Sequence, residues 1–461
     1  TSGGEYNVTV GDEAGTAITT GTDNSLLGFE SGKAITTGDE NTAIGYRSLL
    51  AVTEGDQNCA VGHSALASVT TADHNVAVGS NAGGSVTTGT QNTLIGGLAG
   101  DALTDADYNV AVGAGALTLD TLGSRSVAIG TGALSAQNFT SATDSYNVAV
   151  GYDAGDGITT GIYNTLIGGL AGDALTDADF NVAMGTGALG ADTLGSRSTA
   201  LGYRALYTQN FTSATDTNNV AVGYDAGFAV TTGRHNNFFG AAAGDALTDG
   251  DANVAIGTAS LGSDTRGNFS VAIGHAALNS QNTTNDTDMY NTAVGYHAGT
   301  AVTTGTENTL IGALAGDALT DADANVAIGV GALGADTVGS KTVAIGMNAL
   351  ETQNMGSATD TYNVAVGFEA GQLLTTGTNN TFIGGLSGDG NTDGNTNTAV
   401  GSQTLRANQR GDKNTAIGYK ALIDMNPSGD VDTFNTAVGF FAGVAATTGI
   451  RNTYLGGETA N

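Results

Sequence analysis

The sequence of 461 residues contains one cysteine, one proline and no tryptophan. A single cysteine cannot form a disulfide framework, and the lack of proline excludes collagen. Basic residues are also scarce, since 13 Lys and Arg stand against 44 Asp and Glu and give a formal net charge of -31. Phosphate contacts require a basic surface, so this balance argues against a nucleic-acid partner.

The sequence has no apolar run of about 18 residues, so we expect no membrane insertion. Thr1 does not open a basic and then apolar signal peptide, so export would have to precede this mature chain. What the chain has in quantity is glycine, with 73 residues, and 40% hydrophobic residues, which argues against disorder. A glycine-rich chain of small residues is usually repetitive.

A short repeat fills the sequence. The phrase Asn-Val-Ala-Val-Gly, or a close variant, returns with a 17-residue period from Asn7 to Ser126, and a 21-residue unit follows. We number positions within a unit from 0 at the Asn of this phrase. From Asn75 onward the lengths 17, 17, 17 and 21 recur as a 72-residue super-repeat, and the chain holds 26 units. Glycine occupies position +4 in all 26 units.

This register predicts one continuous solenoid over residues 1–461 in place of the three domains that the length suggests. We divide it into four 17-residue coils (1–74), five super-repeats (75–434) and a terminal partial super-repeat (435–461). A 17-residue unit is too short for a helical hairpin, and glycine comes every few residues. Two strands of about five residues and two tight turns would fit.

We therefore predict an all-β parallel β-solenoid of about 26 coils, which at the usual strand spacing would form a rod roughly 125 Å long. Aliphatic residues at +3, such as Val78, and small residues at +7, such as Ala82, are expected to fill a narrow interior. Position +8 alternates in pairs between Gly and Leu. The Asn column is expected to stabilise a corner, and the +4 glycines to supply turns or allow close backbone approach.

Two segments carry a family resemblance. Asn41-Thr42-Ala43-Ile44-Gly45-Tyr46 and Asn414-Thr415-Ala416-Ile417-Gly418-Tyr419 resemble the head repeats of YadA-type trimeric autotransporter adhesins and the 17-residue repeats of phage tail-fibre-like surface proteins. The resemblance covers essentially the whole chain. It implies a left-handed parallel β-roll, commonly trimeric, that works as an adhesive or spacer fibre.

The residues give no sign of catalysis. The five histidines have no position of the repeat common to all of them, namely His63, His74, His235, His275 and His297. The sequence also lacks a nucleophile elbow, a P-loop and a dinucleotide fingerprint. We expect a protein that is not an enzyme and needs no organic cofactor.

Acidic turns recur every four coils and could supply oxygen ligands to Ca²⁺. They contain Asp101, Asp105, Asp107, Asp173, Asp177, Asp179, Asp245, Asp249, Asp251, Asp317, Asp321 and Asp323. Equivalent turns would lie about 19 Å apart, so adjacent coils could not share an ion. Solvated acidic turns are the main alternative.

Threonine occupies +12 in most units, and a regular threonine array could bind ice. Neighbours such as Thr87 and Thr88 would point to opposite faces of a strand, so a hydrogen-bonded structural column is the favoured interpretation.

The 21-residue coils should bulge on one edge of the solenoid. Their loops contain Asn138, Asn210 and Asn282, which match the Asn-x-Ser/Thr glycan acceptor rule. Packing between chains, glycan attachment and partner recognition remain open for these loops. Aromatic residues recur beside the repeat, just before the Asn or just after the +4 Gly, and they favour packing over a carbohydrate platform.

The first and last coils are incomplete, and their residues together number one fewer than a 17-residue coil. An uncapped solenoid exposes strand edges. This favours head-to-tail assembly, in which Thr1, Ser2 and Gly3 of one chain would meet Tyr454, Leu455 and Gly456 of the next, or else a fragment of a longer fibre.

These observations together predict a structural subunit of an extracellular, cell-surface or virion fibre, self-associating as a trimer or filament. The alternative is an adhesin head or tail fibre that binds a host-surface glycan or receptor, and an ice-binding protein is a third hypothesis.

Overall fold

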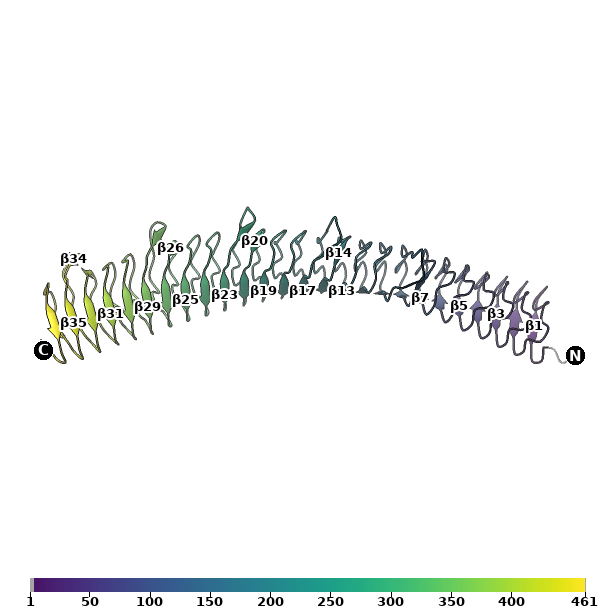
Figure 1. Ribbon diagram of the computed structural model, residues 1–461, viewed down its shortest axis with the longest axis horizontal. Helices are drawn as coiled ribbons and strands as arrows, with labels where there is room; N and C mark the ends of the chain where they lie inside the picture. The colour runs from purple at the N-terminus through teal and green to yellow at the C-terminus, as the bar shows by residue number, and fades with distance from the viewer. Residues whose placement is uncertain (1–3, 461) are drawn as a thin grey trace. The chain divides into compact units, whose positions relative to one another are not determined.

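The computed structural model describes residues 4–460, which form strands, turns and bends without a helix. The chain divides into two compact units, Thr1–Thr232 and Gly233–Asn461. Each unit is a run of 13 coils, and each coil contributes one strand of three residues. The predicted all-β parallel solenoid of 26 coils is therefore confirmed. In Figure 1 the strands of each unit follow one another in chain order.

The 13 principal strands of the first unit are β1 (Val8–Val10), β2 (Ser25–Leu27), β3 (Thr42–Ile44), β4 (Cys59–Val61), β5 (Val76–Val78), β6 (Thr93–Ile95), β7 (Val110–Val112), β9 (Val127–Ile129), β11 (Val148–Val150), β12 (Thr165–Ile167), β13 (Val182–Met184), β15 (Thr199–Leu201) and β17 (Val220–Val222). Those of the second unit are β18 (Asn237–Phe239), β19 (Val254–Ile256), β21 (Val271–Ile273), β23 (Thr292–Val294), β24 (Thr309–Ile311), β25 (Val326–Ile328), β27 (Val343–Ile345), β29 (Val364–Val366), β30 (Thr381–Ile383), β31 (Thr398–Val400), β33 (Thr415–Ile417), β35 (Thr436–Val438) and β36 (Thr453–Leu455).

Equivalent residues of successive coils pair in parallel. Val76 of β5 pairs with Thr93 of β6 across a 17-residue coil, and Val127 of β9 pairs with Val148 of β11 across a 21-residue coil. The longer coils therefore keep the register and place their four extra residues outside the sheet.

The prediction of two five-residue strands per coil was wrong. Each coil has one three-residue principal strand, five of the 17-residue coils add a strand of two residues, and the rest of each coil is turns, bends and irregular segments. Residues with positive φ recur around each coil, among them Asn81, Gly83 and Gln91 in a single coil, and they interrupt any longer strand. Backbone hydrogen bonds still join the coils outside the strands, as where the amide of Thr87 donates to the carbonyl of Thr104.

The strand orientation also differs from the prediction for position +3. The middle strand residue, at +2, points inward and is buried at Ala77 and Leu94, while Val78 and Ile95 at +3 lie on the outside with 38% of their surface exposed. Neighbouring strand residues alternate between faces, so only one of these two columns can line the interior. The interior is too narrow for a large residue in every coil and takes the column that is mostly alanine.

The core is filled by complementary volumes at +2, +7, +8 and +11. The +7 alanines Ala82 and Ala99 are fully buried, as predicted. Leu94 at +2 packs on two glycines at +8. Its side chain leaves no room for a larger residue there, because a Cβ at Gly83 would lie 2.6 Å from its Cδ1 and a Cβ at Gly100 would lie 2.7 Å from its Cδ2. Coils with Leu at +8 carry Ala at +2 instead, which explains why Gly and Leu alternate at +8 in pairs.

The +4 glycine is required for two reasons in every coil that another coil follows. Gly96, for example, has a φ of 137°, which residues with a side chain rarely adopt, and a Cβ there would overlap the carbonyl of Gly113 in the next coil. The predicted close approach of backbones is thus confirmed.

The Asn column is a buried ladder, as predicted for a structural corner. The amide of Asn92 donates to Oδ1 of Asn75 at 2.9 Å, and Nδ2 of Asn92 donates to the carbonyl of Ala106 at 2.8 Å. Each Asn therefore joins two coils and closes its own.

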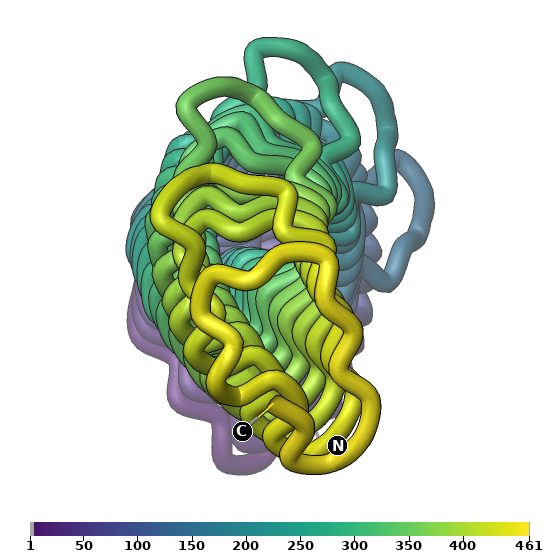
Figure 2. Tube along the Cα trace, turned by 90° about the vertical axis from the view of Figure 1, so that its left-hand side faces the viewer, coloured from purple at the N-terminus to yellow at the C-terminus, as the bar shows by residue number. Residues whose placement is uncertain are grey.

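The 21-residue coils add two-residue strands that pair in parallel with the coil before. These pairs are β8 (Gly123–Ser124) with β10 (Thr143–Asp144), β14 (Gly195–Ser196) with β16 (Thr215–Asp216), β20 (Gly267–Asn268) with β22 (Thr287–Asp288), β26 (Gly339–Ser340) with β28 (Thr359–Asp360), and β32 (Gly411–Asp412) with β34 (Val431–Asp432). Figure 2 shows loops of these longer coils projecting beyond the outline that the other coils share.

Candidate interaction surfaces

The outer face of the principal strands is a uniform surface that runs through each unit. Among the 26 principal strands, every +3 position holds Val, Ile, Leu, Met or Phe, and every +1 position holds Val, Thr, Ser, Cys or Asn. These outward positions therefore carry no charge, on a chain whose formal net charge is -31. Surfaces of soluble monomers rarely keep apolar patches of such extent, and patches of this kind mark interaction sites.

In many coils aromatic residues border this face, at the position before the Asn or the position after the +4 Gly. In the first unit Tyr146, Tyr163 and Phe180 stack in successive coils, with ring centroids 5.3 and 5.0 Å apart. On the other border, Phe29, Tyr46 and His63 stack at 5.4 and 5.0 Å. The ring faces cover one another, which favours the packing interpretation of these residues and leaves mainly their edges to solvent.

An ion pair holds four of the five bulges to the coil before. Arg125 Nε lies 3.0 Å from Asp144 Oδ2 in β10, and its guanidinium stands 4.8 Å from the ring centroid of Tyr108. The equivalent pairs are Arg197–Asp216, Lys341–Asp360 and Lys413–Asp432. The hydrogen bond from Lys341 lowers the pKa of the Asp360 carboxyl. Two-residue strands with an ion pair form bulges of defined conformation.

The proposed recognition residues Asn138, Asn210 and Asn282 are exposed on the bulges. Each Oδ1 accepts a hydrogen bond from the +12 threonine of the preceding coil, and for Asn138 the donor is Thr121 at 3.2 Å. Asn354 occupies the same position without a following Ser or Thr acceptor and makes the same bond with Thr337. The asparagine is therefore retained where the glycan motif is lost, which points to a structural role for its side chain.

The acidic turns do not gather their carboxylates. The +13 residue Asp105 accepts a hydrogen bond from the hydroxyl of Thr88, and the +15 residue Asp107 accepts one from the backbone amide of Thr90. The +9 residue, Asp101, accepts one from Thr118. Within residues 4–460, no group of three or more His, Cys, Asp or Glu could hold a metal ion. The calcium hypothesis for these turns stays a prediction.

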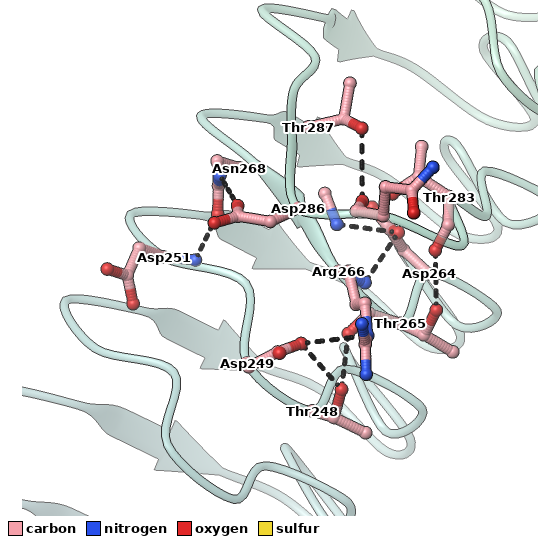
Figure 3. A network of polar contacts seen from close by, with 12 residues as sticks. Thr248, Asp249, Asp251, Asp264, Thr265, Arg266, Asn268, Thr283, Asp286 and Thr287 are labelled. Carbon is pink, nitrogen blue, oxygen red and sulfur yellow. Dashed lines mark hydrogen bonds and ion pairs between the residues drawn. The ribbon is translucent and has the colours of Figure 1, made fainter.

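Figure 3 shows the same arrangement in the second unit, where the acidic residues bond to their neighbours one by one. Asp249 Oδ1 accepts from the Thr248 hydroxyl and lies 3.5 Å from Arg266 Nε. The amide of Asp251 donates to Asn268, whose Nδ2 donates to Asp286 in the bulge. The acidic residues of this turn thus each contact different partners in their own or the following coils.

The +12 threonines form the hydrogen-bonded column that was favoured over an ice-binding array. The hydroxyl of Thr87 donates to the carbonyl of Thr104, and that of Thr104 donates to the carbonyl of Thr121. Thr320 repeats the pattern with Thr337 in the second unit. These hydroxyl protons are used within the chain.

The sequence analysis missed a buried polar cluster in each of the first four super-repeats. Asp120, at +11, is fully buried, and its carboxylate accepts hydrogen bonds from Gln137 Nε2 at 2.6 Å and from the amides of Gly123 and Phe139. Gln137 Oε1 in turn accepts from Asn147. Equivalent clusters surround Asp192, Asp264 and Asp336. The signal was a polar pair, Asp and then Gln, that recurs in a column whose other members are mostly Val, Leu and Ile.

The predicted assembly residues at the ends are described in part. Thr1, Ser2 and Gly3 lie outside the described residues, whereas Tyr454 and Leu455 belong to β36, where Leu455 is exposed. The described residues form no helix long and apolar enough to span a membrane.

No family model matches the chain, and no curated protein matches it. The resemblance to adhesin heads and tail fibres therefore stays a prediction that these comparisons do not test.

Proposed function

We propose that this chain is a non-enzymatic structural subunit of an extracellular or virion fibre, and that copies of it associate through the outer faces of their principal strands. The observation that carries the proposal is the absence of charge from every outward position of those 26 strands. An acidic chain that keeps one face free of charge has a face suited to a copy of itself, because apolar contact there brings no two carboxylates together.

The energies are consistent with a stable association. Ile95 keeps 38% of its surface exposed. Burying a whole aliphatic side chain is worth roughly 1.5–3 kcal/mol, so covering this share gains about 0.6–1.1 kcal/mol per coil. The 13 strands of one unit would bring about 7–15 kcal/mol, against an association cost of roughly 4–15 kcal/mol. The +1 column and the aromatic borders add to this sum.

Cysteine offers a direct probe of this face. Cys59 is the only cysteine and lies at +1, between Thr42 and Val76 on the outside of the strands. We expect its reaction with a maleimide to be fast at low protein concentration and slow once copies associate.

The decisive experiment introduces charge on the face and measures mass by analytical ultracentrifugation. Ile95→Lys with Ile129→Lys would require two lysines to be buried without partners, so we expect the dissociation constant to rise at least about 100-fold. Ser85→Lys, at an exposed position on another edge of the coil, is the matched control and should leave association unchanged. A wild-type chain that stays monomeric at every concentration, with Cys59 equally reactive throughout, would refute the proposal.

A second candidate function is recognition of a host glycan or receptor by the bulges, which is favoured by their exposure and defined conformation. Trimming the loops of Asn138, Asn210 and Asn282 to 17-residue coils separates the two. Loss of cell or glycan binding with intact association would support recognition.

A further inference from the structure

One edge of the second unit carries a hollow of about 330 Å³, lined among others by Leu314, Asp317, Gly331, Gly334 and Glu351. This volume falls within the range of small ligand sites, which is roughly 300–1,000 Å³. The hollow lies at positions +6 and +9 of three successive coils, away from the strand face discussed above. The two glycines of the middle coil leave its floor without side chains.

The first unit repeats the first two coils of this site, whereas its third coil differs at Arg204, where the second unit has Asn348, and at +9. Leu170-Ala-Gly-Asp173 matches Leu314-Ala-Gly-Asp317, and Gly187-Ala-Leu-Gly190-Ala matches Gly331-Ala-Leu-Gly334-Ala. In the third coil, however, Tyr207 stands where the second unit has Glu351.

In the first unit the tyrosine ring fills the hollow. A Cβ at Gly190 would lie 3.0 Å from Cε2 of Tyr207, and one at Gly187 would lie 3.4 Å from its Cδ2. In the second unit the nearest side-chain atom to a Cβ at Gly334 is Asp317 Oδ1, at 3.5 Å. Glu351 leans to the following coil, where its Oε2 accepts a hydrogen bond from Gln372. The place that the ring takes beside Gly190 is therefore open beside Gly334, whereas a Cβ at Gly331 would lie 2.8 Å from Asn348 Oδ1.

The chemistry of the hollow is that of a cation site. Burial raises the pKa of the Asp317 carboxyl, and within residues 4–460 neither Asp317 nor Glu351 forms an ion pair with Lys or Arg. The last complete super-repeat shows what satisfies the equivalent aspartate. There Arg406 replaces the glycine at +9, and its Nε lies 3.3 Å from Oδ2 of Asp389.

We propose that this hollow binds the guanidinium group of an arginine side chain presented by a partner polypeptide. A guanidinium is planar, as the ring of Tyr207 is. It also carries a positive charge, which neither Asp317 nor Glu351 has as an ion-pair partner from Lys or Arg within residues 4–460. Its fork of donors can reach carboxylate oxygens on both sides, and Leu314, which is half exposed, offers contact to the aliphatic stem. The site is independent of the strand face and of the association proposed for it.

The test uses the full chain and three tripeptides, acetyl-Gly-Arg-Gly-amide and its lysine and citrulline counterparts, in equilibrium dialysis at low salt. The arginine peptide should occupy one saturable site per chain. The neutral citrulline peptide, and the lysine peptide with its compact ammonium, should bind at least tenfold more weakly. Equal binding of the arginine and lysine peptides would overturn the assignment to a guanidinium.

Two reciprocal substitutions locate the site. Glu351→Tyr should fill the hollow and abolish saturable binding, while Tyr207→Glu should open a second site and double the stoichiometry. Each variant carries a residue that the same chain tolerates in the equivalent place, and circular dichroism checks that the fold is kept. Binding that persists in Glu351→Tyr would show general attraction to the acidic surface and would refute the proposal. If Tyr207→Glu fails to fold, the Glu351→Tyr result decides alone.

Discussion

The buried aspartate clusters make a sharp prediction because the chain contains its own variant of them. In the fifth super-repeat Asn408 stands where the others have aspartate, Met425 where they have glutamine, and Pro427 where the first has Phe139. Methionine has no amide donor and proline has no N–H, so two of the three donors to the carboxylate are gone together. The amide of Gly411 still donates to Asn408 Oδ1, at 2.9 Å. The loss of charge thus coincides with the loss of its donors.

We therefore expect Gln137→Met to destabilise its coil strongly and Asp120→Asn to relieve the damage. Gln137 Nε2 donates to the fully buried Asp120 carboxylate at 2.6 Å. A hydrogen bond to a charged group contributes about 1.5–3 kcal/mol, and the bond that Gln137 accepts from Asn147 adds about 1 kcal/mol. The single variant should lose about 3 kcal/mol. The double variant, with a neutral amide, should recover about 1–2 kcal/mol of this loss.

Native-state hydrogen exchange is the suitable assay, because a solenoid need not unfold in one step. The amides of Gly123 and Phe139 both donate to Asp120 Oδ1, so their exchange reports opening of this cluster. In Gln137→Met their exchange should accelerate by about 100-fold. The equivalent amides of Gly339 and Met355, which donate to Asp336 in the second unit, serve as the internal control. A double variant no more stable than Gln137→Met alone would refute the reasoning.

Three further predictions concern other columns. Gly96→Ala should prevent the native coil from forming and abolish the cooperative thermal transition of its neighbours, because its Cβ would overlap the carbonyl of Gly113. In the same thermal melt the control Gly97→Ala should change the midpoint little, because no atom lies within 4 Å of the new Cβ. Leu94→Ala should cost about 2–5 kcal/mol in urea titrations, since this side chain fills the space over two glycines. Burial raises the pKa of Asp389 and Arg406 partly lowers it again, so Arg406→Gln should raise that pKa further in a ¹³C NMR titration. A carboxyl whose pKa is higher in the folded than in the unfolded state stabilises the fold at low pH, and this stabilisation is lost as the pH rises through the folded-state pKa. In Arg406→Gln the same loss of stability should occur at a higher pH.

The period of the sequence predicted the features that repeat in every coil. The register, the Asn ladder and the +4 glycine follow from a strict period, because only equal positions can stack. The side of the strand that faces inward could not be read from residue size. Val78 is larger than Ala77 and by hydrophobicity alone belongs in a core, yet the narrow interior admits the alanine. The choice depends on the diameter of the coil, which no single unit reveals.

The candidate sites were harder to predict for a related reason. Asp120 and Gln137 are ordinary surface residues in composition, and only their place in a column of Val86 and Leu103 marks them as buried. Beside its glycines, the hollow near Asp317 differs from the filled site by Asn348 and Glu351 in place of Arg204 and Tyr207. A motif search passes over such a difference, whereas a comparison of equivalent coils shows it at once.

The four-coil period has a consequence for how such a chain changes over time. The core at Leu94 depends on glycines in two coils, and the Asp120 cluster joins two more, so no single coil can be removed without leaving a mismatch. A whole 72-residue block can be removed, because Asn75 and Asn147 open equivalent coils and meet equivalent neighbours. Unequal recombination between super-repeats would thus lengthen or shorten the gene in whole blocks while every interface stays intact. Length is a heritable variable here, and it changes in steps of four coils.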